Sequence, residues 1–174
     1  WSFQIVENIF SVLQNGVDSS IGYYDMFGHS SGAQFVQRFT FFVPSSRIRL
    51  AIAANAGWYT LPDLNTKFPY GLKHPKLNLT DAHLESWSKK YLLIMRGTKN
   101  TKRTAQVRQT KLADEQGPNR FERAEYMFKM MKSKYPKTNW RLVDAPDVGH
   151  SQSKMAEMAR RMLRLINSQD KKNR

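Results

Sequence analysis

The residues best suited to chemistry are a serine and its neighbours near the start of the chain. Gly28-His29-Ser30-Ser31-Gly32 matches the pattern G-x-S-x-G, in which the serine occupies a sharp turn between a strand and a helix. On such a turn the Ser30 hydroxyl is exposed as a nucleophile, and the Ser31 N–H points at a developing oxyanion. We expect side chains at positions 28 and 32 to collide with neighbouring elements, and both are glycine. His29 points in another direction than Ser30, so we assign it to packing or to a substrate pocket.

A serine nucleophile needs a base, and His150 is the best placed of the four histidines. It follows Ala145-Pro146-Asp147-Val148-Gly149, a loop between a predicted strand and the last predicted helix. A neutral imidazole at that place can take the proton of Ser30 and return it to the leaving group. His74 and His83 lie in an irregular segment, where exposure to solvent is the default.

The residue that orients this imidazole is expected in the loop Gly97-Thr98-Lys99-Asn100-Thr101. Asn100 stands where a carboxylate is expected. An amide can orient an imidazole but cannot stabilise its positive form by charge, and in a serine protease the Asp→Asn change lowers turnover by about 10⁴-fold. Three interpretations stay open. Asn100 serves as a neutral third member, a carboxylate such as Asp63 or Asp147 substitutes for it, or the protein is a weak or inactive hydrolase.

Alternating helices and strands must position these residues. Periodicity and turn residues predict, in chain order, a helix over 3–14, a strand over 21–27, a turn over 28–32, a helix over 33–42, strands over 49–54 and 90–95, a helix around 121–131, a strand over 139–143 and a helix around 155–165. This order predicts an α/β fold in which helices cover both faces of a parallel sheet. We expect a single domain over residues 1–174. Residues 57–88 interrupt the pattern with a long excursion that contains one short helix near 81–88, and irregular segments of this length are usually functional.

Several blocks of the sequence together resemble one family. They are residues 28–35, 54–59, 68–72, 116–117, 120, 123–124 and 148–150. In these blocks, which span nearly the whole chain, the protein resembles α/β-hydrolases related to polyhydroxybutyrate depolymerases and feruloyl-type esterases. The resemblance implies an esterase-like serine hydrolase that needs no metal or organic cofactor and acts on a small or polymeric ester. The position of Asn100 is typically aspartate in such families.

The resemblance also gives the excursion a role. Residues 57–88 would form a cap over the site, and their aromatic side chains would form an apolar wall for the acyl or aromatic part of a substrate. The predicted members of this wall are Trp58, Tyr59 and Tyr70, together with Phe68 and Trp87.

The resemblance further implies that part of the family's sheet is absent. The chain begins just before what resembles the fifth strand, so the N-terminal strands and the loop that supplies a second oxyanion N–H would be missing. The strand over 21–27 would then expose an apolar edge, which is an aggregation hazard. We expect a longer native chain, or another copy in a homo-oligomer, to cover this edge.

Composition narrows the classes of function. The 174 residues, 40% of them hydrophobic, suffice for a folded core, and no apolar run approaches the roughly 20 residues that span a bilayer. The absence of cysteine excludes disulfides, thiolate catalysis and Cys-based zinc sites. A net charge of +14 attracts polyanions and anionic surfaces in general. Because no nucleic-acid-binding motif concentrates this charge, we expect a basic solvated surface with no specific nucleic-acid partner, and the compartment stays open.

Overall fold

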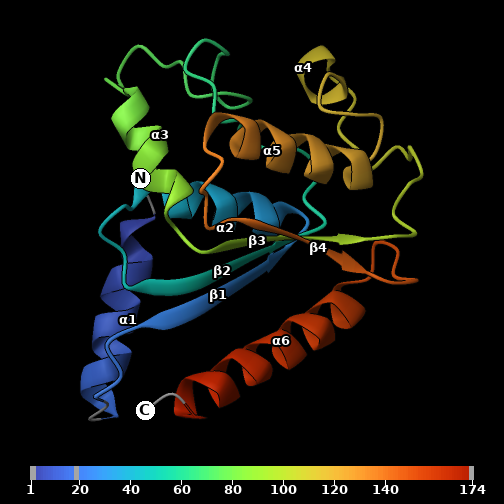
Figure 1. Cartoon of the computed structure of the whole chain (residues 1–174). Helices are drawn as coiled ribbons and strands as arrows, with labels where there is room; N and C mark the ends of the chain where they lie inside the picture. Colours follow the sequence, from blue (N-terminus) through green and yellow to red (C-terminus); the bar gives the residue numbers. More distant parts are fainter. Residues whose placement is uncertain (1–2, 18–19, 173–174) are drawn as a thin grey trace.

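The structure is a computed structural model that describes residues 3–17 and 20–172. Its centre is a parallel sheet with strand order β1-β2-β3-β4, formed by β1 (Tyr24–His29), β2 (Ile48–Ala54), β3 (Leu92–Gly97) and β4 (Arg141–Ala145). The helices are α1 (Gln4–Gly16), α2 (Ser31–Phe42), α3 (Asp81–Ser88), α4 (Lys111–Asp114), α5 (Arg120–Lys134) and α6 (Gln152–Lys172). Figure 1 shows α2, α3 and α5 on one face of the sheet and α6 on the other.

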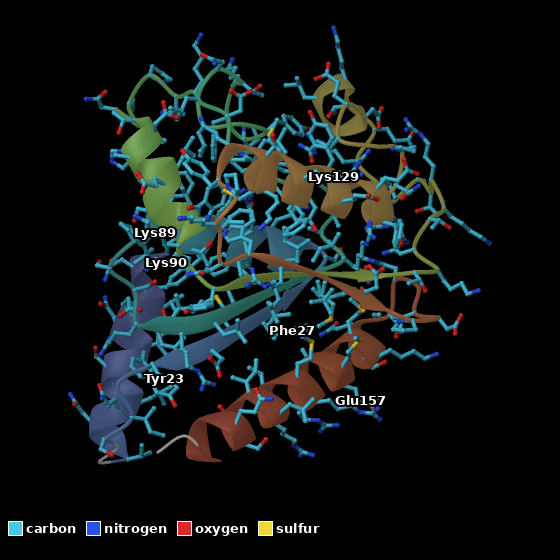
Figure 2. The ribbon with its side chains drawn as sticks, in the orientation of Figure 1. Tyr23, Phe27, Lys89, Lys90, Lys129 and Glu157 are labelled. Atoms are coloured by element: carbon cyan, nitrogen blue, oxygen red, sulfur yellow. The ribbon has the colours of Figure 1, made fainter. Side chains whose placement is uncertain are left out.

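Alternating side chains along the strands build one core on each face of the sheet. In β2, Ala51 and Ala53 pack on the side of α2 and α5, whereas Leu50 and Ile52 pack on the side of α6. Phe27 of β1 also points toward α6 (Figure 2). Because both faces are covered, nearly all of β2 and β3 is buried. The predicted parallel α/β architecture is therefore confirmed.

Three strands end two residues later than the sequence indicates. Their last residues are His29, Gly97 and Ala145. The apolar pattern stops earlier because glycine and polar residues take over at these ends, while the parallel pairing continues through His29↔Ala54 and Gly97↔Ala145. The first strand also begins three residues later than predicted, at Tyr24. Ser30, Asn100 and His150 therefore lie shortly after these strand ends.

The excursion has the irregular character that the sequence indicates. Residues 57–80 contain no helix or strand, only an isolated bridge between Lys67 and Lys73, and α3 follows where a short helix is predicted. The sequence does not predict α4, because a single helical turn is too short to show a periodicity. None of the helices in the described part of the chain is both long and apolar enough to cross a membrane.

The first strand lies at an edge of the described sheet, since β1 pairs with β2 alone. The neighbouring helix α1 is anchored through Glu7, which accepts a hydrogen bond from the Tyr24 hydroxyl and forms a 2.7 Å ion pair with Arg47. The outer side of α1 carries exposed apolar residues, namely Ile5, Ile9, Val12 and Leu13. The edge thus has the exposed apolar surroundings that the sequence predicts, and what covers it stays a prediction.

The turn between β1 and α2 consists of one residue, Ser30. Packing requires Gly28, because a Cβ there would lie 2.2 Å from the Gly32 carbonyl oxygen and 2.8 Å from Val36 Cγ2. The prediction that a side chain at position 32 would also collide is wrong, because a Cβ on Gly32 would meet nothing within 4 Å. Of the two positions, 28 is therefore the one that requires glycine for steric reasons, because the backbone of the first turn of α2 fills the space beside it.

We expect Gly28→Ala to lower the free energy of unfolding by about 2–4 kcal/mol, because backbone atoms rather than a flexible side chain block the added methyl group. Gly32→Ala is the matched control and should be neutral or stabilising by up to about 1 kcal/mol, since glycine is a poor helix residue. Urea unfolding of both variants measures the difference. Equal effects of the two substitutions would contradict this account of the turn.

Candidate active site

The carboxyl ends of β1, β3 and β4 bring three predicted site residues together. The Ser30 Oγ lies 3.1 Å from His150 Nε2, although the two residues are 120 positions apart. The other ring nitrogen of the imidazole, Nδ1, lies 3.3 Å from the side-chain nitrogen Nδ2 of Asn100. Because the strands are parallel, all of them end at the same edge of the sheet (Figure 1). A hydroxyl, an imidazole and an amide therefore form a continuous row along that edge.

The backbone of Ser30 is held in a rarely populated conformation, with φ 57° and ψ −116°. Its N–H donates to the Ala54 carbonyl at 2.9 Å, and its carbonyl accepts from the N–H groups of Ala33 at 3.1 Å and Gln34 at 3.3 Å. These bonds fix the residue from both sides. Ser31 opens α2, so its N–H has no acceptor within the helix and is available to an oxyanion beside Ser30.

The loop that carries the imidazole is fastened to the loop that follows β3. The Lys99 N–H donates to the Val148 carbonyl at 2.9 Å, and the Asp147 N–H donates to Thr98 Oγ1 at 2.9 Å. Gly97 permits this close approach, because a Cβ there would lie 2.3 Å from the Val148 carbonyl oxygen. Hydrogen bonds and close packing therefore join the two loops and hold the Asn100 and His150 side chains near each other.

Asn55 ties both of these loops to β2, a role that the sequence analysis did not identify. Its side chain is fully buried, donates from Nδ2 to the Gly149 carbonyl at 3.1 Å and accepts from the Gly97 N–H at 2.9 Å. Its φ of 51° is one that asparagine tolerates better than most residues. The sequence signal that could have identified this role is an asparagine directly after a predicted buried strand. Asn55 thus holds the residue that precedes His150.

Two imidazoles lie against each other beside Ser30. The His29 and His150 rings lie 4.5 Å apart between centroids, and His29 Nε2 is buried with no hydrogen-bond partner in the described part of the chain. Burial, then the charge of Arg120, then His29 lower the pKa of His150 to about 4. Burial and then Arg120 also lower the pKa of His29. At neutral pH the imidazole of His150, a residue with exposed surface, is therefore uncharged.

The two carboxylates considered as alternatives to Asn100 do not contact the imidazole. The Asp63 carboxylate accepts hydrogen bonds within its own loop, from the Asn65 N–H and the Thr66 hydroxyl. The Asp147 side chain is 84% exposed and pairs with Lys99 at 3.4 Å. Among the residues that the structure describes, no carboxylate forms a hydrogen bond or ion pair with His150. The geometry therefore favours Asn100 over both acids as the neighbour of the ring.

The residues of the predicted aromatic wall differ in how far they are exposed to solvent. Trp58 is partly exposed, with the Tyr70 ring 4.6 Å away and the Arg38 guanidinium 4.5 Å above its ring. Tyr70 is 8% exposed, and its hydroxyl lies 2.6 Å from Thr110 Oγ1, so it mainly supports Trp58. The prediction that Tyr59 contacts substrate is wrong, because this side chain has no exposed surface and packs in the core. Its aromatic character could not distinguish a core residue from a surface residue.

Two solved structures share this architecture. The poly(aspartic acid) hydrolase-1 of Sphingomonas sp. KT-1 matches with a TM-score of 0.89 and 37% sequence identity over 92% of this chain. The fold is that of an α/β-hydrolase. LpqC, a poly(3-hydroxybutyrate) depolymerase of Bordetella parapertussis, matches with a TM-score of 0.78 and 28% identity over 86% of this chain. The resemblance to depolymerases of the α/β-hydrolase fold seen in the sequence is thus confirmed at the level of structure.

The chain spans only part of those relatives. It covers 62% of the Sphingomonas enzyme and 53% of the Bordetella enzyme. No protein-family model matches the sequence, and no curated protein matches it significantly. The likeness therefore describes the part of the fold that carries Ser30, Asn100 and His150.

We expect Asn55→Gly to lower the free energy of unfolding by about 2–4 kcal/mol, because it leaves a buried N–H and a buried carbonyl without partners. Glycine accepts the positive φ at this position, so the loss reports the hydrogen bonds rather than backbone strain. Chemical denaturation measures the change, and the NMR signals of the His150 ring report whether the loop has moved. Asn65→Gly, at an exposed loop position, is the control. A loss below about 0.5 kcal/mol for Asn55→Gly would argue against this latch.

Proposed function

We propose that this chain carries the catalytic serine and histidine of a hydrolase that cleaves carboxylic esters. One contact supports the proposal above all others. The Ser30 hydroxyl stands on a strained turn at the carboxyl edge of a parallel sheet, 3.1 Å from a histidine ring nitrogen. A hydroxyl in hydrogen-bond reach of a neutral imidazole has the geometry of a nucleophile with its general base.

The reaction would pass through an acyl-enzyme. His150 Nε2 takes the proton of the Ser30 hydroxyl while Oγ attacks the ester carbonyl carbon, and the Ser31 N–H donates to the oxyanion that forms. The imidazolium then gives its proton to the departing alkoxide, and the carbon–oxygen bond of the ester breaks. Water, activated by the same imidazole, hydrolyses the acyl-enzyme and restores Ser30. No step in this sequence calls for a metal or an organic cofactor.

Asn100 would set the tautomer of the base. For Nε2 to accept a proton, Nδ1 must carry one, and the Asn100 carbonyl oxygen must accept it. A half-turn of the amide exchanges its oxygen with the nitrogen that lies 3.3 Å from Nδ1. With the nitrogen toward Nδ1, the ring proton lies on Nε2 and the base is blocked. Amide orientation would therefore control how much of the enzyme is ready to react.

The names of the relatives suggest a polymeric substrate. One is a hydrolase of poly(aspartic acid) and the other a depolymerase of poly(3-hydroxybutyrate), so both cleave acyl linkages along a chain. An open surface suits such a substrate, and the partly exposed Trp58 follows β2 near the same edge of the sheet as Ser30. We assign the partly buried His29 to the wall beside the nucleophile, because its ring lies 4.5 Å from that of His150, tilted by 36°.

A second candidate function is that of a hydrolase-fold binding protein with little or no activity. The observation that favours it is Asn100, which gives the imidazole an uncharged neighbour. Loss of the carboxylate in a serine triad removes most of the turnover but leaves the serine in place. The two candidates differ in whether the Ser30 hydroxyl reacts.

The reactivity of Ser30 can be tested with a fluorophosphonate probe, which labels activated serines. We expect one labelled site, identified by mass spectrometry as Ser30, and no label in Ser30→Ala. Ser86→Ala, at an exposed serine of α3, serves as the control and should label normally. An unlabelled protein with a normal unfolding transition would support the binding protein and reject the hydrolase.

Asn100→Asp should raise kcat, by roughly 10- to 1,000-fold, because a carboxylate both selects the productive tautomer and stabilises the imidazolium. The new charge should also raise the pKa of His150 from about 4. Since only the neutral imidazole acts as base, the acid limb of kcat/KM should then move to higher pH. Rates measured from pH 4 to pH 9 for both forms check this. An unchanged profile would show that position 100 does not act on the base.

A further inference from the structure

Arg120 is a buried arginine that forms no ion pair with the residues that the structure describes. It is the first residue of α5 and only 5% exposed. Of its donors, Nη2 alone has a partner in the described part of the chain, the Gln106 carbonyl at 3.1 Å, and Nε is buried with none. The cost of burying a guanidinium is ordinarily offset by carboxylates or by several acceptors. Arg120 therefore has N–H donors to which the described residues offer no acceptor.

The other buried arginines show what a satisfied guanidinium looks like in this protein. Arg96 pairs with Asp144 at 2.6 Å and with Glu125 at 3.1 Å. Arg123 pairs with Asp114 and donates to three backbone carbonyls. Both arginines have structural partners on neighbouring elements. Arg120 therefore stands apart from them in chemistry as well as in position.

Arg120 lies at the edge of the sheet that carries the candidate active site, because its guanidinium donates to the Gln106 carbonyl in the loop that follows β3. Its charge acts on both imidazoles beside Ser30, those of His29 and His150. His29 Nε2 is itself buried without a partner, and its ring lies 4.5 Å from the His150 ring. Two buried polar atoms without a partner among the described residues, one on β1 and one at the start of α5, thus belong to side chains that act on His150. Both can donate to an anion.

Within the described ranges, the groups that contact His150 or act on its charge either oppose a positive charge on it or are neutral. His29 comes from β1, Arg120 from α5, and Ser30 and Asn100 from the loops after β1 and β3. On the loop of His150 itself, the exposed Asp147 pairs with Lys99. Acyl transfer nevertheless requires the imidazolium as an intermediate state. The site therefore lacks one negative charge at the place where it has an unused cation.

We propose that Arg120 binds a carboxylate group of the substrate and that this carboxylate supplies the negative charge that Asn100 does not. The inference rests on the proposed hydrolase function and names its substrate class, which is esters whose acyl part carries a free carboxylate. The carboxylate keeps its charge throughout. The proton still passes from Ser30 to His150 and then to the leaving alkoxide, so the bound anion acts by charge alone. Its effect falls on the step in which the imidazolium forms, and hence on kcat.

A matched pair of esters tests this in turnover. Monomethyl glutarate carries a carboxylate, whereas methyl 4-nitrobutanoate has a neutral nitro group of the same shape, and both release methanol. We expect kcat to be about tenfold or more higher for the glutarate ester, as one nearby opposite charge justifies. Arg120→Gln should bring the two values together, and Asn100→Asp should shrink the difference, because its own carboxylate already stabilises the imidazolium. Arg160→Gln, at an exposed position of α6, is the control and should keep the preference.

A second measurement needs neither turnover nor a variant of a buried residue. The pKa of His150 is followed by NMR in the unmodified protein, with glutarate and with the neutral pentane-1,5-diol. Glutarate should raise this pKa and the diol should not. Glutarate without effect on His150 would overturn the proposal. If the fluorophosphonate labels Ser30 while both esters react with equal kcat, the substrate class is wrong although the hydrolase stands.

Discussion

The Asn55 side chain holds the site together through two backbone groups. It joins the end of β2 to Gly97 at the end of β3 and to Gly149 in the loop after β4. A parallel sheet brings strand ends to one edge but does not by itself set the height or direction of the loops that follow them. The buried amide supplies that missing constraint, because displacing either loop would leave polar groups unpaired in the core. The contact between Ser30 and His150 depends on this arrangement.

Geometry and charge are controlled by different residues in this site. Bonds from Asn55, and the close packing over Gly97, position the imidazole without touching its charge. Burial, Arg120 and His29 lower the pKa of the ring, and Asn100 contacts it without a charge. Such a division allows the electrostatic environment to change while the row of hydroxyl, imidazole and amide stays in place. Replacing a carboxylate by an amide at position 100 is a change of this kind, since the two side chains have nearly the same shape.

Local patterns in the sequence were sufficient for the fold and for the main contact of the site. The elbow motif around Ser30, the loop before His150 and the alternation of helices and strands each carry a local signal, and parallel topology brings the strand ends together. Arg120 and Asn55 could not be assigned roles in the same way, because their importance lies in which partners they have or lack in three dimensions. The prediction that Tyr59 contacts substrate is wrong for a related reason. An aromatic residue in an irregular segment has no sequence pattern that reveals its burial.

β1 is an edge strand of the described sheet, and Ser30 comes directly after its last residue. Gly28 and His29 are the last residues of this strand, which pairs only with β2 in the described sheet, and Ser30 follows them directly. Any chain that added itself along this border would hydrogen-bond to the same short stretch of backbone that aims the hydroxyl. Association with such a chain would then act on the same backbone that positions Ser30. A partner bound at this edge could change the orientation of the serine without contacting the substrate.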